Sequence, residues 1–134
     1  MRSLASLTTA IVVAGCVVHL DLEKDKPLHR AVHTGERDQV AFFYSLKPMC
    51  EVDVLPEITV VTAPGHGNVS FGNGQDYPDY SPNNIRYDCN KQLVQGTQLF
   101  YQSAADFQGA DSFVVDVRFA NSHVRTITYK IAVH

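Results

Sequence analysis

The sequence predicts an all-β protein, an antiparallel β-sandwich of about seven strands. Residues 113–119 and 127–133 alternate apolar and polar side chains with a period of two, the pattern of strands with one buried and one solvated face. Breaker clusters such as Ala63-Pro64-Gly65 separate short runs of β-branched and aromatic residues. Beyond residue 16, no stretch has a clear 3.6-residue apolar period, so nothing in the pattern favours a helical body.

Six strands are expected within the chain, and a short additional strand is expected near residue 37. In 39–44, Val40, Phe42 and Tyr44 are expected to share one face. The other expected strands cover residues 57–62, 66–71, 97–102, 113–119 and 127–133. Six or seven short strands in about 95 residues fit two sheets that cover each other, and a small closed barrel is the alternative that alternation leaves open.

The N-terminal residues have the features of an export signal. Arg2 precedes twelve uncharged residues, 4–15, which is too short for a helix that must cross a hydrocarbon core of about 30 Å. A positive start, a brief apolar segment and small residues at its end are typical of a signal peptide. The run Val13-Ala14-Gly15-Cys16 resembles the bacterial lipoprotein lipobox.

That resemblance implies an anchor. Residues 1–15 would be removed as a lipoprotein signal peptide, and Cys16 would carry the acyl chains that hold the protein on the membrane. Each buried methylene stabilises such an anchor by roughly 0.8 kcal/mol. The expected location is the cell envelope, and Val17 after the cysteine favours the outer membrane. The alternative is an ordinary signal peptide, with Cys16 incidental.

Removal of 15 residues from 134 leaves a chain of single-domain size. We expect a lipidated cysteine and flexible tether over 16–37 and the sandwich over 38–134. The net charge of −3 and the lack of a Lys/Arg run argue against a nucleic-acid partner. The sequence does not predict the oligomeric state.

Three cysteines are an odd number for an exported chain. If Cys16 is lipidated, Cys50 and Cys89 remain, and an oxidising compartment favours a disulfide between them. Two buried, reduced cysteines are the alternative.

Residues 72–96 form an expected loop that is long for a compact domain, and long loops are often functional. We predict a binding surface there, positioned by the Cys50–Cys89 link. Its candidate residues are Tyr77, Asp79, Tyr80, Arg86 and Tyr87. The alternative is a stapled loop whose tyrosines cover one end of the sandwich.

Two segments resemble bacterial Ig-like and cadherin-like repeats, namely VVTAPGHGNVSF (60–71) and LFYQSAADFQGADSFVVDV (99–117). The matching residues of the second are Tyr101, Phe107, Gly109, Asp111, Ser112, Phe113 and Val117. The resemblance implies an Ig-like sandwich and an exported setting, without an activity. Gly67 and Gly109 are expected to allow tight turns, and Asp111 to accept hydrogen bonds from backbone amides.

The sequence contains no hydrolase motif and no phosphate-binding glycine loop, so we predict no catalytic residue, cofactor or metal. His66 lacks an evident catalytic partner in the sequence. The predicted function is a non-catalytic envelope lipoprotein that contacts protein or glycan through loops. The alternative is a metal-binding lipoprotein that uses His29 and His33, spaced to align on a helix, or the acidic residues of the 72–96 loop (Asp76, Asp79 and Asp88).

Overall fold

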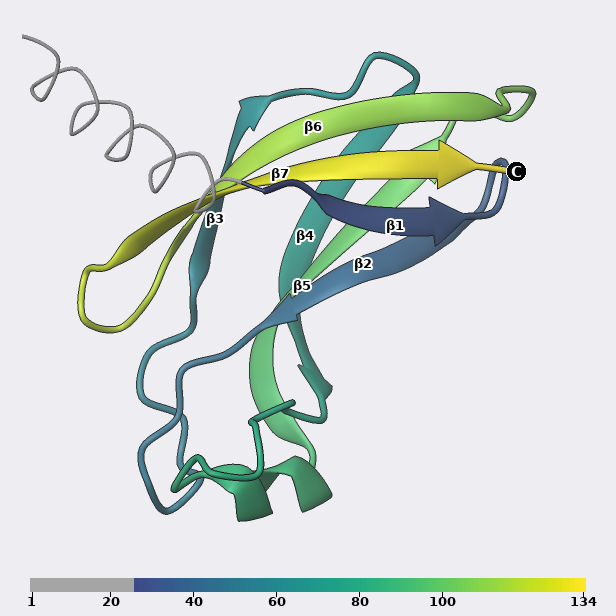
Figure 1. Cartoon of the computed structure of the whole chain (residues 1–134). Helices are drawn as coiled ribbons and strands as arrows, with labels where there is room; N and C mark the ends of the chain where they lie inside the picture. The colour runs from purple at the N-terminus through teal and green to yellow at the C-terminus, as the bar shows by residue number, and fades with distance from the viewer. Residues whose placement is uncertain (1–25) are drawn as a thin grey trace, which may run out of the picture.

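A computed structural model describes residues 26–134, and these residues form two facing β-sheets (Figure 1). The predicted signal peptide and Cys16 lie outside the described residues. The first sheet contains β1 (Leu28–Val32), β7 (Val124–Val133), β6 (Gly109–Arg118) and β3 (Glu57–Thr62), in that order. The second contains β2 (Arg37–Phe43), β5 (Val94–Ser103) and β4 (Gly67–Asp76). The predicted seven-stranded all-β sandwich is confirmed.

The order of strands is that of an immunoglobulin-type sandwich. The sheet β2-β5-β4 corresponds to strands B-E-D, and β7-β6-β3 corresponds to G-F-C. The first strand departs from the antiparallel expectation, because β1 pairs with β7 in parallel, from Leu28 opposite Tyr129 to Val32 opposite Val133. This pairing covers half of the outer edge of β7 before the chain crosses to the other sheet.

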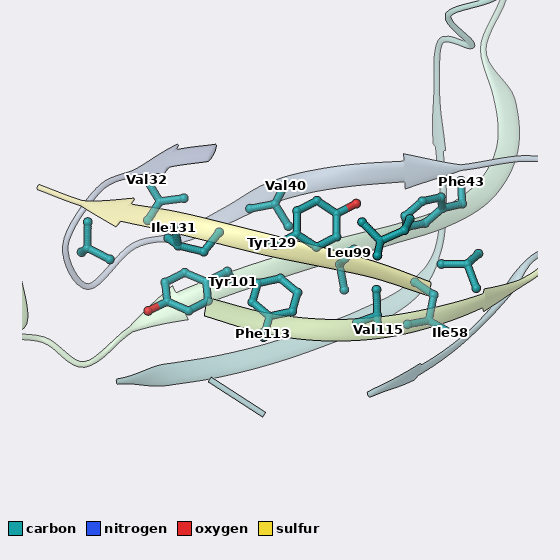
Figure 2. Packing of buried hydrophobic residues seen from close by; sticks show 13 residues of the cluster. Val32, Val40, Phe43, Ile58, Leu99, Tyr101, Phe113, Val115, Tyr129 and Ile131 are labelled. Atoms are coloured by element: carbon teal, nitrogen blue, oxygen red, sulfur yellow. The ribbon is translucent and has the colours of Figure 1, made fainter. Parts of the chain in front are cut away.

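The core lies between the two sheets, as Figure 2 shows. Leu99, Tyr101, Phe113 and Val115 have no exposed surface. The period-two alternation of β6 and β7 is confirmed, since their alternate apolar residues point inward. The cluster consists of Val32, Val40, Phe43, Ile58, Leu99, Tyr101, Phe113, Val115, Val117, Ile127, Tyr129, Ile131 and Val133.

The expected face of β2 is wrong beyond Val40. Gln39 pairs with Phe100 and Ala41 pairs with Leu99, so Val40 is an extra residue in a β-bulge. A bulge shifts the alternation by one position. Phe43 therefore enters the main core, whereas Phe42 packs against a second, smaller cluster.

Two element boundaries also differ from the expectation. β1 and Arg37, the first residue of β2, fall within the expected tether, so the sandwich includes residues from Leu28 onward rather than from residue 38 onward. β4 and β5 pair without interruption from Gly67 opposite Ser103 to Asp76 opposite Val94. The irregular excursion is consequently 77–93 rather than 72–96, because ladder hydrogen bonds hold the glycine-rich segment in a strand.

Asp111 organises one end of the sandwich. Its Oδ2 accepts hydrogen bonds from the Tyr101 hydroxyl (2.7 Å) and from the His66 amide (2.9 Å). Its Oδ1 accepts from the amides of Gly65 (2.9 Å) and Ser112 (2.8 Å). The predicted role of Asp111 as an acceptor of backbone hydrogen bonds is confirmed.

These contacts perturb both titrating groups. Burial raises the pKa of Asp111, but the Tyr101 hydroxyl and the three amides outweigh it and hold this pKa below its ordinary value. The pKa of Tyr101 is raised, mainly by burial and then by the hydrogen bond to Asp111 and the negative charge of Asp111. At neutral pH the pair is therefore a carboxylate and a protonated phenol.

The two glycines of the resembling segments have different roles. Gly109 has a φ of +134°, which side chains rarely allow, but it is the first residue of β6 and pairs with Val133, so the expected turn at this position is wrong. Gly67 does not have a positive φ, so the expectation for it is wrong. Instead, a Cβ at this position would lie 2.5 Å from the Gln102 carbonyl oxygen and 2.8 Å from the Tyr101 hydroxyl oxygen. Close approach of the backbones explains glycine here.

Within 26–134, no helix is long and apolar enough to cross a membrane.

Candidate binding surface at the disulfide-linked tip

The predicted disulfide is present. Cys50 and Cys89 are bonded at 2.02 Å, and they link a turn after β2 to the 3-10 helix η2 (Tyr87–Lys91) across 39 positions of sequence. We call the two linked segments, residues 44–53 and 77–93, the tip; they lie at the lower end of the sandwich in Figure 1. The disulfide is consistent with an exported, non-cytosolic protein.

The tip has a small apolar core of its own. Leu46 and Cys89 are buried there together with Val94, the first residue of β5, apart from the main cluster. Tyr44 and Tyr80 both pack against this core. Their rings contact each other edge to face, with centroids 5.3 Å apart and planes at 71°. The tip is thus a packed extension of the sandwich and not a loose loop.

Side-chain hydrogen bonds hold the backbone of the 77–93 segment. The Asn90 amide group bonds Tyr80 twice, accepting from its N–H and donating to its carbonyl oxygen, each at 2.9 Å. The Asp79 amide donates to the Tyr44 hydroxyl oxygen at 2.7 Å. Arg86 Nε donates to the Leu46 carbonyl oxygen at 2.8 Å. These contacts tie the segment to itself and to residues 44–46.

A groove of about 370 Å³ lies between the tip and the β6–β7 connection. We call it the tip groove. Its lining consists of Ser45, Leu46, Asp53, Tyr80, Arg86, Phe119, Ala120 and Asn121. The volume is at the small end for ligand sites, enough for one amino-acid side chain or one sugar ring.

The groove combines hydrogen-bonding groups with aromatic surface. Burial and the neighbouring Tyr44 raise the pKa of Tyr80, and the positive charge of Arg86 opposes them in part. The Tyr80 hydroxyl therefore stays protonated at neutral pH. The groove thus contains the Tyr80 hydroxyl, the Arg86 guanidinium and the Asp53 carboxylate. Together these groups can bind a polar group of either charge.

The structure brings together two of the five predicted binding residues, since Tyr80 and Arg86 both line the groove. Tyr77, Asp79 and Tyr87 are exposed and do not line it. The other groove residues come from the segments after β2 and after β6, and they were not predicted from the sequence. No local motif marks them, because only the packing of the tip against the β6–β7 connection places them beside Tyr80.

Large apolar side chains are concentrated on the outside of the tip. Met49 and Ile85 are 83% and 77% exposed, and Tyr77, Tyr87 and Leu93 are between 43% and 54% exposed. Five of the nine exposed large apolar side chains of residues 26–134 therefore lie in the tip. Exposed apolar and aromatic side chains are typical of interaction surfaces.

The acidic residues predicted as metal ligands, Asp76, Asp79 and Asp88, do not come together. Asp76 accepts hydrogen bonds from Tyr77 and Gln39, and Asp88 pairs with Lys91 at 3.7 Å. In the described part of the chain, no group of potential metal ligands includes the acidic residues proposed from the loop. The exposed His66 ring stacks on Phe107, with centroids 4.1 Å apart, which is a packing role.

Comparisons with known proteins add little. No protein-family model and no curated protein matches the chain. A solved structure described as "Solution Structure of Amebosin" aligns over 84% of this chain and 92% of its own, with 13% sequence identity and a TM-score of 0.42. At that TM-score nothing about this chain is inferred from the likeness.

Proposed function

We propose that this protein is an exported, lipid-anchored, non-catalytic module that binds a protein or glycan of the cell envelope through its tip. The observation that carries the binding role is the coincidence, at one end of the sandwich, of exposed aromatic and apolar side chains with a rigid backbone. The proposed lipid anchor rests on the lipobox-like residues Val13 to Cys16. The disulfide supports export from the cytosol.

Rigidity favours binding, because a surface that is already ordered loses less conformational entropy when a partner docks. The disulfide and the hydrogen bonds of Asn90 and Arg86 supply that order. Tyrosine suits such a surface, since it offers a large contact area and a hydroxyl while few torsions are lost. Tyr77 and Tyr87 present these groups to solvent.

The tip groove would define specificity. It accommodates a single side chain or sugar ring, while the outward tyrosines and Ile85 contact the rest of the partner. Tyr80 and Arg86 would bind polar atoms of that inserted group, with Phe119 as its apolar wall.

The proposed lipid anchor is tested by following the maturation of the protein in cells. Globomycin, or the change Cys16→Ser, should block lipoprotein maturation and leave the protein unacylated. Membrane fractionation of metabolically labelled cells measures both effects. Unchanged maturation together with a fully soluble product would contradict the lipid anchor while leaving the binding role untouched.

The binding role is tested by crosslinking on intact cells, followed by mass spectrometry. The double change Tyr77→Ala and Tyr87→Ala should remove most crosslinks, because both side chains are about half exposed and lie outside both apolar clusters. Phe71→Ala, which removes an exposed aromatic from β4 outside the tip, is the matched control and should leave them unchanged. Crosslinks that survive the tip variant, or that spread evenly over both ends of the domain, would refute the proposal.

A further inference from the structure

The turn between β1 and β2 gathers side chains that ligate metals. Residues His33 to Glu36 form a tight turn, in which the Glu36 amide donates to the His33 carbonyl oxygen at 3.2 Å. Gly35 is the third residue and has a φ of +75°, the conformation that a type II turn requires at that position. The turn therefore places His33 and Glu36 side by side, next to Asp38 of β2.

The spacing of the three side chains fits a shared ion. His33 Nδ1 lies 3.3 Å from Asp38 Oδ2 and 3.8 Å from Glu36 Oε2. One ligand atom from each of the three residues lies within 4.8 Å of the others. Two ligands at about 2.0–2.1 Å from a tetrahedral zinc ion are about 3.3–3.4 Å apart. The two distances from His33 Nδ1, 3.3 Å and 3.8 Å, are close to that separation, so His33 could share an ion with either carboxylate without a change of the backbone.

A second imidazole lies next to this group. The His134 ring is edge-on to the His33 ring, with centroids 6.3 Å apart and planes at 79°. Its backbone is fixed by two hydrogen bonds, from its amide to the Val32 carbonyl oxygen and from the Thr34 amide to its own carbonyl oxygen. Figure 1 shows the end of the chain beside the β1–β2 turn. The His134 side chain is exposed and lies outside the group of three ligands, so it would have to turn toward His33 to supply a fourth ligand.

Neighbouring elements hold the turn in place. The Gly35 amide donates to the Ser103 hydroxyl oxygen at 2.8 Å, and Gln102 Nε2 donates to the Gly35 carbonyl oxygen at 2.9 Å. The Thr34 hydroxyl donates to the Phe107 carbonyl oxygen at 3.0 Å. Binding an ion here would order only the side-chain ends, since the backbone is already fixed.

We propose that His33, Glu36, Asp38 and His134 bind a divalent transition-metal ion. Two imidazoles and two carboxylates suit zinc and its neighbours better than calcium, which prefers six or more oxygen ligands. The two carboxylates also balance the charge of the ion. The site lies at the opposite end of β2 from the tip, so it is independent of the proposed binding surface.

The predicted alignment of His29 with His33 on a helix is wrong. Both residues belong to the β1 region, which is extended, so four positions separate their backbones by about 13 Å. His29 is exposed on β1 and takes no part in the group. It therefore provides a histidine control on the same strand.

The test is calorimetric titration of the whole chain with zinc chloride, with calcium chloride in parallel. We expect one zinc ion per chain, at least tenfold weaker binding in His33→Ala, Glu36→Gln and His134→Ala, and an affinity within twofold of the parent in His29→Ala. Bound Co²⁺ should give the intense visible bands of a four-coordinate N/O site, and His33→Ala should abolish them. Melting of each variant without metal establishes that it is folded.

Three results would overturn the proposal. These are no zinc-dependent heat at millimolar zinc, binding that His33→Ala and Glu36→Gln leave unchanged, and binding of calcium tighter than that of zinc. The second result would place any zinc on other residues of the chain, and the contact of His33 with Asp38 would then be a local hydrogen bond of the turn only.

Discussion

The hydrogen bond between Tyr101 and Asp111 provides a sharp test of how the sandwich is held at one end. In Tyr101→Phe the ring keeps its place in the core, and only the hydroxyl is lost. That hydroxyl belongs to a side chain with no exposed surface and donates to a carboxylate at 2.7 Å. Hydrogen bonds to charged groups typically contribute about 1.5–3 kcal/mol. Because three amides continue to bind Asp111, we expect a loss within that range and not a collapse.

Asp111→Asn should cost more, about 2–4 kcal/mol. Each carboxylate oxygen accepts two hydrogen bonds, one pair from Gly65 and Ser112 and the other from His66 and Tyr101. Either orientation of an asparagine amide therefore turns its NH₂ toward at least one backbone N–H. That backbone donor loses its partner, and the remaining hydrogen bonds lose their charge assistance.

Urea denaturation followed by circular dichroism measures both losses, with the m-value checked for constancy. Tyr129→Phe is the matched control, since Tyr129 is equally buried but its hydroxyl does not bind Asp111. The double variant Tyr101→Phe with Asp111→Asn should lose less than the sum of the single losses, because the two side chains share one interaction. Equal losses in Tyr101→Phe and Tyr129→Phe would refute the reasoning.

The same pair sets a pH dependence. The folded pKa of Asp111 is below its ordinary value of 3.8, so its stabilisation is present above that pH and is lost as the pH falls through the folded pKa. The folded pKa of Tyr101 is raised above its ordinary value of 10.0, so its stabilisation is present below pH 10 and is lost at higher pH. Parent and Asp111→Asn stabilities should therefore converge in acid, and parallel curves would contradict this assignment.

Two further substitutions test other parts of the fold. The double change Cys50→Ser and Cys89→Ser should lower the free energy of unfolding by about 4 kcal/mol, because the disulfide closes a loop of about 40 residues. Urea denaturation measures this loss, and a loss below about 1 kcal/mol would contradict the prediction. Gly67→Ala should destabilise the protein by more than about 1 kcal/mol, since its Cβ would meet the Gln102 carbonyl oxygen, whereas Gly72→Ala, with nothing within 4 Å, should be close to neutral. Thermal melts compare the two glycine variants, and equal melting temperatures would refute the close-approach argument.

The alternation of apolar residues predicted most of the fold. In β6 and β7 each inward residue follows from period two, because strand side chains point to opposite sides in turn. The same rule failed in β2, where an extra residue at Val40 exchanged the roles of Phe42 and Phe43. A bulge depends on how the partner strand pairs, so alternation along one strand does not reveal it.

The candidate sites were less accessible to sequence reasoning. Tyr80 and Arg86 were expected from the aromatic and charged character of their segment, and both line the tip groove. Asp53 and Phe119 belong to segments that only tertiary packing brings there. The group around His33 was also missed, because the spacing of His29 and His33 suggested a helix, whereas the chain makes a strand and a turn.

The sequence by itself determined the all-β class, the inward faces of β6 and β7, the disulfide and the acceptor role of Asp111. Each depends on local periodicity, on a count of cysteines or on one short motif. The tertiary structure decided the parallel pairing of β1 with β7, the bulge at Val40, the tip groove and the meeting of His33 with His134. These features depend on which segments, far apart in the sequence, meet at one edge or one end of the sandwich. The local pattern of side chains does not encode such long-range contacts.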